Sequence, residues 1–443
     1  TASLRSELPG LNLSIYAADE WCCDAAALER CREDIARGDI ILATMLFLDE
    51  HIQSVLPALI ARREHCDAII GCLSAGEVVR LTRLGKLTMS GSGGGVLSML
   101  RRLRGGGKSG GSSGQGQMKM LRQMPRLLRF IPGTAQDLRA YFLTLQYWLA
   151  GSEENFANLV RFLIGRYASG PRAALRGMVK AADPIAYPDL GLYHHRLPKK
   201  FATRTEELPA NPKPAGRVGV LLMRSYLLAG NTAHYDGVLE SLESRGLNVI
   251  PAFASGLDSR PAVERYFMKD GVATVDAVVS LTGFSLVGGP AYNDARAAEA
   301  MLTALDVPYV AAHPLEFQTV EQWRDDARGL TPVEATMMVA IPELDGAIAP
   351  MTFGGRSSIA DSGHDMAPMV ERSIMLAARV AKLVALRKIA RAERKLAIVL
   401  FNFPPNGGSA GTAAYLSVFE SLHHTMTALK AAGYDVDVPA TVE

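Results

Sequence analysis

Short apolar runs alternate with amphipathic stretches along the first hundred residues. Strand-like runs occupy 13–17, 39–45 and 67–73, and helical patterns occupy 24–37 and 49–63. Strands that alternate with helices of roughly ten to fifteen residues are typical of a parallel sheet with crossover helices. The pattern therefore predicts an α/β unit over 1–100. Residues 1–8 resemble the end of a helix with no strand before it, so this unit is expected to begin part-way through a fold.

The same alternation returns in the second half of the chain. Strands are predicted at 217–223, 248–253, 276–281 and 307–311, with helices at 232–245, 260–269 and 292–305. These elements predict a second α/β unit over 217–365. A long helical pattern at 366–395, a strand at 396–401, a helix at 412–431 and a strand at 434–438 predict the start of a third unit over 366–443. Two strands do not form an independent sheet, so the third unit is expected to be truncated.

A helical segment and an extended connection separate the α/β units. Apolar residues recur at helical spacing through 138–149 and again through 156–164, with a break at Gly151 and Ser152, which predicts a helical hairpin within 101–183. Proline and glycine are frequent over 184–216, which indicates an extended linker. The expected fold class is multidomain α/β, with parallel-sheet units joined by a helical segment.

Composition and charge narrow the class of protein. The chain has 443 residues, enough for two or three domains, and 48% of them are hydrophobic, which excludes a disordered chain. The net charge of +2 provides no global argument for a nucleic-acid or membrane partner. The longest apolar run, 40–48, is too short to cross a bilayer. The five cysteines form no Cys-x-x-Cys pair, and with no secretory signal this favours the cytoplasm.

The charge is strongly asymmetric in one stretch. Residues 78–136 contain no acidic side chain and eleven basic ones, all between Arg80 and Arg129, and the centre, 105–116, is rich in glycine and serine. The stretch suits an anionic partner subunit, lipid headgroups or nucleic acid. A solvated loop flanked by basic helices is the more common explanation of such a pattern.

Three glycine-containing loops each follow a predicted strand and precede a predicted helix. They span 224–234, 282–290 and 401–415. Ligands in open α/β sheets bind at the carboxyl ends of strands, where glycine lets backbone N–H groups approach a carboxylate or phosphate. A structural turn with an N-cap explains the 401–415 loop equally well, and each loop taken singly is more often structural. The candidate substrate-binding residues are Asn406, Gly407, Gly408, Gly411, Thr412, Gly288, Gly289, Asn231 and His234.

No metal site or nucleotide loop is predicted. A phosphate-binding loop ending at Gly107-Lys108-Ser109 would require glycine at 102, where the chain has Arg102. Adjacent side chains on a helix point about 100° apart, so His423 and His424 cannot both face one ion.

Several longer motifs carry a family resemblance. They are 116–139, Tyr141-Phe-Leu-Thr-Leu-Gln-Tyr-Trp-Leu-Ala-Gly-Ser-Glu-Glu-Asn155, 288–291 and Pro404-Pro-Asn-Gly-Gly-Ser-Ala-Gly-Thr-Ala-Ala-Tyr-Leu416. Together they resemble the amino-terminal region of the large-subunit family of magnesium and cobalt chelatases. The first segment and the long helical stretch favour the magnesium branch, that is, the large H subunit of magnesium chelatase.

The resemblance implies a porphyrin-binding subunit that inserts Mg²⁺ into protoporphyrin IX during chlorophyll or bacteriochlorophyll biosynthesis, as part of photosynthesis. It implies two smaller partner subunits, one an ATPase that hydrolyses ATP. It places the catalytic residues beyond Glu443, so this chain alone is expected to be inactive. The expected location is cytoplasmic, with peripheral contact to a photosynthetic membrane through 80–129 as a candidate and no nucleic-acid partner. The alternatives are a cobaltochelatase large subunit acting on a corrin precursor and a non-catalytic module that binds a tetrapyrrole or small ligand.

Overall fold

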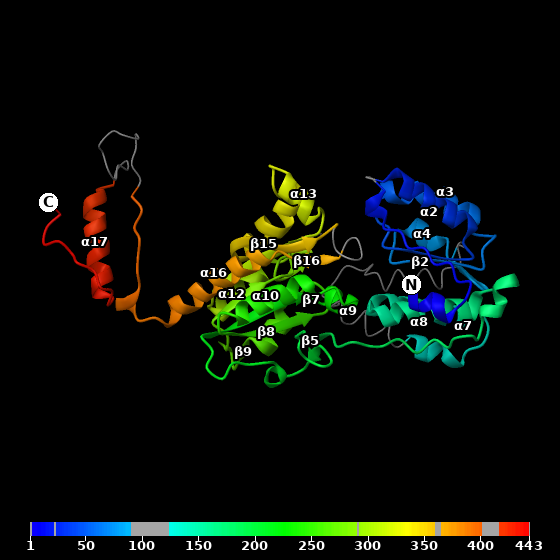
Figure 1. The fold of residues 1–443 in the computed structure, drawn as a ribbon, viewed down its shortest axis with the longest axis horizontal. Helices are drawn as coiled ribbons and strands as arrows, with labels where there is room; N and C mark the ends of the chain where they lie inside the picture. The colour runs from blue at the N-terminus through cyan, green and yellow to red at the C-terminus, as the bar shows by residue number, and fades with distance from the viewer. Residues whose placement is uncertain are drawn as a thin grey trace. The chain divides into compact units, whose positions relative to one another are not determined.

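A computed structural model describes residues 2–21, 24–89, 124–289, 292–358, 365–400 and 416–442 (Figure 1). The chain forms two compact units, which are described separately. Unit 1 comprises Thr1–Pro188 and Leu228–Gly230, and unit 2 comprises Asp189–Leu227 and Asn231–Glu443. Among the described residues, no helix combines the length and apolar character that a membrane span requires.

Unit 1 is built on a small mixed sheet. Its strands are β1 (Ile40–Thr44), β2 (Ala68–Cys72), β3 (Arg83–Leu84) and β4 (Leu87–Thr88), in that order, with β1 and β2 parallel. Its helices are α1 (Ala2–Glu7), α2 (Ala25–Arg37), α3 (Asp49–Arg62), α4 (Gly76–Arg80), α7 (Thr134–Ala150) and α8 (Glu153–Tyr167). Helices α2 and α3 cover one face of the sheet and α7 covers the other, each over its own apolar cluster. All five residues of β2 are buried, as a strand with helices on both faces requires.

The predicted helical hairpin is confirmed, and local chemistry explains its corner. Helix α7 ends at Ala150, and Gly151 adopts a left-handed conformation with φ of 65°. Ser152 then caps α8 by accepting a hydrogen bond from the Asn155 N–H.

Unit 2 is built on an eight-stranded sheet in the order β16-β15-β14-β11-β7-β8-β5-β6. The strands are β5 (Leu190–Tyr193), β6 (Phe201–Ala202), β7 (Gly216–Met223), β8 (Leu247–Ala254), β11 (Ala277–Ser280), β14 (Tyr309–Leu315), β15 (Ile348–Arg356) and β16 (Met366–Pro368). The five central strands, from β8 to β15, are parallel. Read across the sheet from β8 to β15, these strands are the second, first, third, fourth and fifth of the five along the chain. This order is that of a doubly wound sheet. The expected α/β fold with parallel sheets is confirmed.

Helices cover both faces of this sheet. The longer ones are α10 (Ala233–Glu243), α11 (Arg260–Tyr266), α12 (Ala295–Leu305) and α16 (Val370–Lys388), and the shorter ones are α9 (Arg224–Ala229), α13 (Val320–Asp325), α14 (Pro332–Glu334) and α15 (Ile341–Asp345). Along β7, Val218 and Val220 face the apolar cluster beneath α10 and α16, whereas Leu221 faces the cluster beneath α11 and α12. This alternation is the period of two that a strand imposes.

Some predicted elements were wrong. Residues 13–17, 396–400 and 434–438 form no strand, and none of them pairs with a neighbouring strand within the described residues. Apolar character alone does not make a strand, because a strand needs a hydrogen-bonded partner. Helix α17 (Val418–Ala431) occupies the later part of the predicted helix at 412–431, whose first residues lie outside the described residues.

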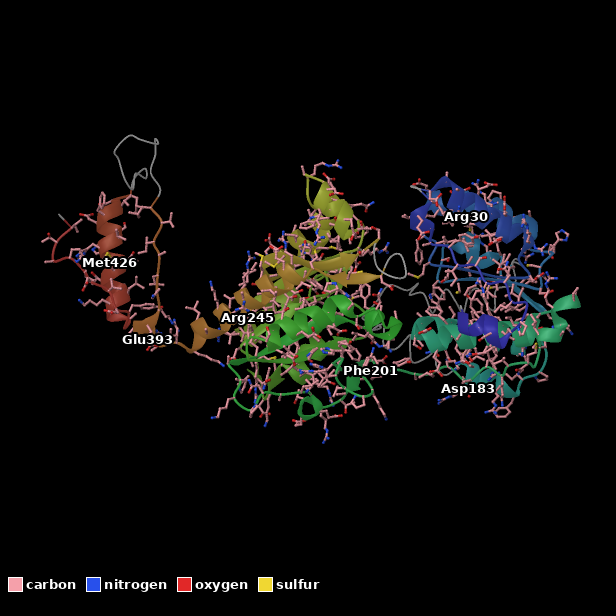
Figure 2. The ribbon with its side chains drawn as sticks, in the orientation of Figure 1. Arg30, Asp183, Phe201, Arg245, Glu393 and Met426 are labelled. Carbon is pink, nitrogen blue, oxygen red and sulfur yellow. The ribbon has the colours of Figure 1, made fainter. Side chains whose placement is uncertain are left out.

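The predicted linker also contains part of the main sheet. Strands β5 and β6 lie within 184–216 and extend the sheet antiparallel from β8. Phe201 of β6, labelled in Figure 2, packs edge-on against Phe253 of β8 with 5.7 Å between ring centroids. The aromatic contact supplies the burial that such short strands lack on their own.

Candidate functional site

The carboxyl ends of β7, β8 and β11 meet at the point where the strand order of unit 2 reverses, which is the usual ligand position in a doubly wound sheet. A cavity of about 10 Å³ lies there, with room for roughly one water molecule. Gly288, one of the predicted substrate-binding residues, lines it. The lining residues are Leu222, Met223, Ala254, Gly256, Leu257, Ser259, Thr282, Phe284, Ser285 and Gly288. The switch point is therefore closed in this structure.

A buried carboxylate holds the loop that closes the switch point. Asp345 accepts hydrogen bonds from the Ser285 hydroxyl at 2.7 Å and from the Leu286 N–H at 2.8 Å. Burial raises the pKa of Asp345, and these two hydrogen bonds partly oppose the shift. The loop then leads into β12 (Gly288–Gly289), which pairs with β13 (Tyr292–Asn293). Gly288 has φ of 125°, a conformation that favours glycine.

Replacing Asp345 by alanine is expected to open this loop. The change leaves the buried Ser285 hydroxyl and Leu286 N–H without their acceptor, which costs roughly 2 kcal/mol of unfolding free energy. Hydrogen exchange of the Leu286 and Val287 amides should accelerate about tenfold or more, because loop opening becomes easier. Glu299→Ala, at an exposed position of α12, serves as the control and should leave that exchange unchanged. Equal protection in Asp345→Ala would show that the carboxylate does not hold the loop.

Asn231 and His234 lie at a different place, around the start of α10. The Asn231 side-chain oxygen accepts a hydrogen bond from the Met366 N–H at 3.0 Å, which ties this turn to β16. The His234 ring is fully buried and stacks on Phe353 with 5.7 Å between centroids and 8° between planes. Both of its nitrogens lack a hydrogen-bond partner among the described residues. Burial lowers the pKa of His234 to about 3, so the ring is neutral at neutral pH.

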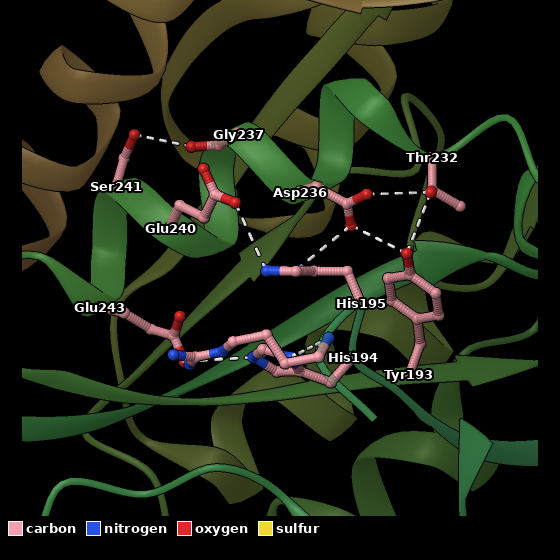
Figure 3. A network of polar contacts seen from close by, with 10 residues as sticks. Tyr193, His194, His195, Thr232, Asp236, Gly237, Glu240, Ser241 and Glu243 are labelled. Atoms are coloured by element: carbon pink, nitrogen blue, oxygen red, sulfur yellow. Dashed lines mark hydrogen bonds and ion pairs between the residues drawn. The ribbon is translucent and has the colours of Figure 1, made fainter. Parts of the chain in front are cut away.

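A polar network fastens this turn to the neighbouring strand (Figure 3). The Tyr193 hydroxyl, from β5, lies 2.9 Å from the Asp236 carboxylate and 3.0 Å from the Thr232 hydroxyl. Asp236 also accepts a hydrogen bond from Thr232 at 3.0 Å. The three side chains join β5 to the first turn of α10, which fixes the position of His234 beside them.

The two histidines that follow β5 extend the same network along α10. The Arg196 N–H donates to His194 Nδ1 at 3.2 Å, so the Nε2 atom of His194 carries the proton and donates to Glu243 at 3.1 Å (Figure 3). The His195 ring stacks on His194 and lies 3.4 Å from a Glu240 oxygen. These histidines are engaged with carboxylates of one helix, which is a structural role.

Two acids in the connection between β14 and β15, Glu316 and Glu334, were missed by the sequence analysis. Glu316 follows β14 directly and accepts a hydrogen bond from the Tyr226 hydroxyl at 2.8 Å. Burial raises the pKa of Glu316, while the Tyr226 hydrogen bond and the charge of Arg356 oppose that shift. Glu334 is fully buried, and one of its oxygens has no hydrogen-bond partner among the described residues. The available signal for Glu316 was an acidic residue immediately after a mostly apolar strand.

The structure does not bring all the predicted site residues together. Among the described residues, no hydrogen bond or ring contact joins the Gly288–Gly289 segment to Asn231 or His234. Asn406, Gly407, Gly408, Gly411 and Thr412 lie outside the described residues. Within the described ranges, no three histidine, cysteine or acidic side chains converge in a way that suits a metal ion.

Unit 1 has a cleft of its own, of about 570 Å³. Charged and polar side chains dominate its lining, which consists of Glu64, His65, Cys66, Asp67, Arg83, Gly85, Asp137, Arg166, Tyr167, Ser169 and Arg176. Asp137 bonds to Arg166 and Tyr167, each at 3.2 Å, so part of this charge is neutralised within the wall. Small-molecule pockets are usually lined mainly by apolar side chains, so this cleft does not suit a flat apolar macrocycle.

Comparison with known families identifies the larger part of the chain. A family model described as CobN/Magnesium Chelatase matches residues 145–443, which is more than half of the chain. The chain belongs to the CobN/magnesium chelatase family. A second model, described only as a domain of unknown function, matches residues 1–142 of this chelatase-family chain.

Individual relatives show which members of the family the chelatase-family chain resembles. It is 49% identical over 458 residues to the magnesium-chelatase H subunit of Cereibacter sphaeroides, a match that covers 99% of the chain and 38% of that relative. It is 37% identical over 426 residues to the chloroplastic magnesium-chelatase subunit ChlH of Oryza sativa subsp. indica, covering 93% of the chain and 30% of that relative. The chain thus spans less than two fifths of the length of these relatives.

A solved structure supports the fold of the chelatase-family chain. The catalytic subunit of cobaltochelatase from Mycobacterium tuberculosis superposes with a TM-score of 0.54 and 20% sequence identity, covering 98% of this chain and 30% of that one. At this level of identity the similarity supports the fold alone.

Proposed function

We propose that this chain forms part of the porphyrin-binding subunit of a magnesium chelatase, which inserts Mg²⁺ into protoporphyrin IX in chlorophyll or bacteriochlorophyll biosynthesis. The 49% identity to a magnesium-chelatase H subunit, over 99% of the chain, carries the proposal. The cobaltochelatase structure shares the fold at only 20% identity. A cobaltochelatase subunit acting on a corrin precursor is therefore the less supported alternative.

The proposed reaction exchanges two pyrrole protons for one Mg²⁺ ion, which enters as a substrate. Mg²⁺ gives up its water reluctantly, so the reaction needs an enclosed site and groups that accept the two protons. In this proposal, two smaller partner subunits, one of them an ATPase, hydrolyse the ATP that drives the insertion. No cluster of three metal-ligating side chains occurs within the residues that the structure describes. We therefore assign the described residues to the scaffold and to porphyrin contacts.

The geometry of the candidate contacts favours a role in closing the porphyrin site. Gly288 lines a cavity that holds roughly one water molecule, and His234 is buried behind Phe353. In this arrangement neither residue touches a macrocycle until the loops move apart. We propose that these residues, with Gly289 and Asn231, hold the closed state of the sheet edge, and that the loop containing Asn406 and Thr412 contacts the porphyrin propionates.

We also propose a cytoplasmic location with peripheral contact to a photosynthetic membrane. The acid-free stretch between residues 78 and 136 supports this part of the proposal, because its cations suit an anionic lipid surface.

Porphyrin binding tests the proposed function directly. The full-length protein that contains this chain should lose tryptophan fluorescence on titration with deuteroporphyrin IX, because the macrocycle binds close to the protein. With both partner subunits, Mg²⁺ and ATP, the fluorescence of Mg-deuteroporphyrin should then appear. A metal-free corrin serves as the comparison ligand. Tighter binding of the corrin would favour the cobaltochelatase alternative, and porphyrin binding without metal insertion would favour a non-catalytic binding module.

A further inference from the structure

Residues 124–131 of unit 1 present large apolar side chains to solvent. The exposed fractions of Leu127, Phe130 and Ile131 are 66%, 85% and 51%. Residues 124–130 are helical and end in a 3-10 turn over Leu128–Phe130, so Leu127 and Phe130, three positions apart, lie on one face. Ile131 follows directly in extended backbone at the end of this turn. Arg126 and Arg129 are exposed in the same turn. We call these five residues the apolar–basic turn.

The apolar–basic turn is held in place by the domain behind it. The Gln136 side-chain amide, on α7, lies within hydrogen-bond distance of the carbonyl oxygens of Leu128, Arg129 and Ile131, at 2.9, 3.1 and 2.6 Å. Arg139 Nε donates to the Pro125 carbonyl at 3.0 Å. Leu128 packs against the apolar cluster of unit 1. The turn is anchored at its base, so its apolar tips are presented to solvent by a preorganised backbone.

The chemistry of the turn suits the interface of a membrane. Apolar side chains beside arginines are the features by which peripheral segments bind anionic lipid, because the apolar groups enter the interface while the cations remain among the headgroups. Residues 78–136 contain no acidic side chain, and the first acid after the turn, Asp137, pairs with Arg166. Arg129 lies over the Phe130 ring at 5.8 Å from its centroid, so cation and apolar group face the same surface.

The size of the turn favours a bilayer over a protein partner. A stable protein–protein interface buries about 800 Å² on each partner and uses roughly 20–30 residues a side. The turn offers only three exposed apolar side chains and two cations, far fewer residues than such an interface uses. A peripheral membrane contact needs only a small apolar area combined with nearby positive charge. We propose that the apolar–basic turn is a membrane-docking site that inserts Leu127, Phe130 and Ile131 into the interface of a bilayer containing anionic lipid. This inference rests on the membrane part of the proposed function and is independent of metal insertion.

Vesicle flotation of the full-length protein tests the proposal. The protein should float with vesicles of equal parts phosphatidylcholine and phosphatidylglycerol, and binding to phosphatidylcholine alone should be much weaker. The double variant Leu127→Ser/Phe130→Ser should reduce partition into the mixed vesicles by at least about 10-fold, since it removes the inserting groups. Arg126→Gln/Arg129→Gln should reduce it by a similar factor and weaken its dependence on salt.

Matched control variants test whether the effect on vesicle binding is specific to the apolar–basic turn. Ile15 is 79% exposed in the same unit, and Ile15→Ser should leave vesicle binding unchanged. Arg176 is exposed as well, and Arg176→Gln should have a small effect compared with the paired arginine variant. Deuteroporphyrin quenching should be the same in all variants, so that loss of docking is distinguished from failure of the proposed porphyrin function.

Two results would overturn the proposal. One is full-length protein that does not float with the mixed vesicles. The other is a Leu127→Ser/Phe130→Ser variant that floats as well as the parent, because the other basic residues would then account for the binding. Loss of binding to an acidic partner protein in the same variant, with flotation unchanged, would assign the turn to a protein interface.

Discussion

Replacing Gly71 by alanine is expected to destabilise unit 1 by about 3 kcal/mol, because the backbone has no space for a methyl group at this position. An added Cβ would overlap the Val78 carbonyl oxygen and lie 2.7 Å from the Val78 carbonyl carbon. Gly71 is in the fully buried β2, and its N–H donates to the Thr82 hydroxyl at 3.0 Å. Relief of the overlap would move β2 away from α4 and break this hydrogen bond.

Gly165→Ala is the matched control, and the opposite sign is expected for it. Gly165 is exposed in α8, and an added Cβ would meet no atom within 4 Å outside the helix backbone. Alanine is a better helix former than glycine, so the variant should gain up to about 1 kcal/mol. Denaturant unfolding followed by tryptophan fluorescence in a Trp323→Phe background reports on unit 1, where Trp21 and Trp148 lie. Equal midpoints for Gly71→Ala and the parent would contradict the packing argument.

Elements with strong periodicity could be predicted from the sequence, and those that depend on distant partners could not. The breaks at Gly151 and Ser152 use local cap chemistry, so the hairpin of α7 and α8 was predictable. Strands β5 and β6 have four and two residues, and they exist because β8 and Phe253 offer them a partner. Strand β15 was missed because Pro350, Gly354 and Gly355 interrupt its apolar pattern.

The glycines of β15 illustrate why such a strand cannot be recognised from a single sequence. An added Cβ on Gly354 would lie 2.6 Å from the Ala367 carbonyl oxygen and 3.0 Å from the His234 Cβ atom. Gly354 thus allows β16 and α10 to pack closely against β15. The requirement arises only once three distant segments have met, so local propensity cannot reveal it.

The candidate site, like the fold, could be predicted from the sequence only in part. A strand followed by a glycine-containing loop predicted a binding site at the edge of the sheet, and Gly288 lines the small cavity there. The loop expected at 224–234 is largely helical: α9 places Tyr226 against Glu316, and the start of α10 places His234 against Phe353. The burial of His234 depends on an aromatic ring from β15, a strand that the sequence pattern had not predicted.

Buried neutral histidines make unit 2 sensitive to acid. Burial lowers the pKa of His234 to about 3 and that of His313 to about 4. The unfolded chain binds a proton at each histidine below about pH 6.5, while the folded chain stays neutral there, so stability falls as the pH falls through that range. Each histidine should cost roughly 2 kcal/mol of unfolding free energy between pH 7 and pH 5. The raised pKa values of Glu316 and Asp345 act in the opposite direction at lower pH.

His234→Phe is therefore expected to stabilise unit 2 in a pH-dependent way. The ring stacks on Phe353 and makes no hydrogen bond to the described residues, so phenylalanine preserves the aromatic contact and removes the buried polar atoms. The advantage over the parent should grow by roughly 2 kcal/mol from pH 7 to pH 5, because the variant loses the proton-linked penalty. Denaturant unfolding at both pH values, with Trp323 as the sole tryptophan, measures this gap. His65→Phe, at an exposed position of unit 1, is the control: its unfolding free energy relative to the parent, followed by Trp323, should be the same at pH 7 and pH 5. A gap that is the same at both pH values would mean that His234 binds its proton in the folded state as readily as in the unfolded chain.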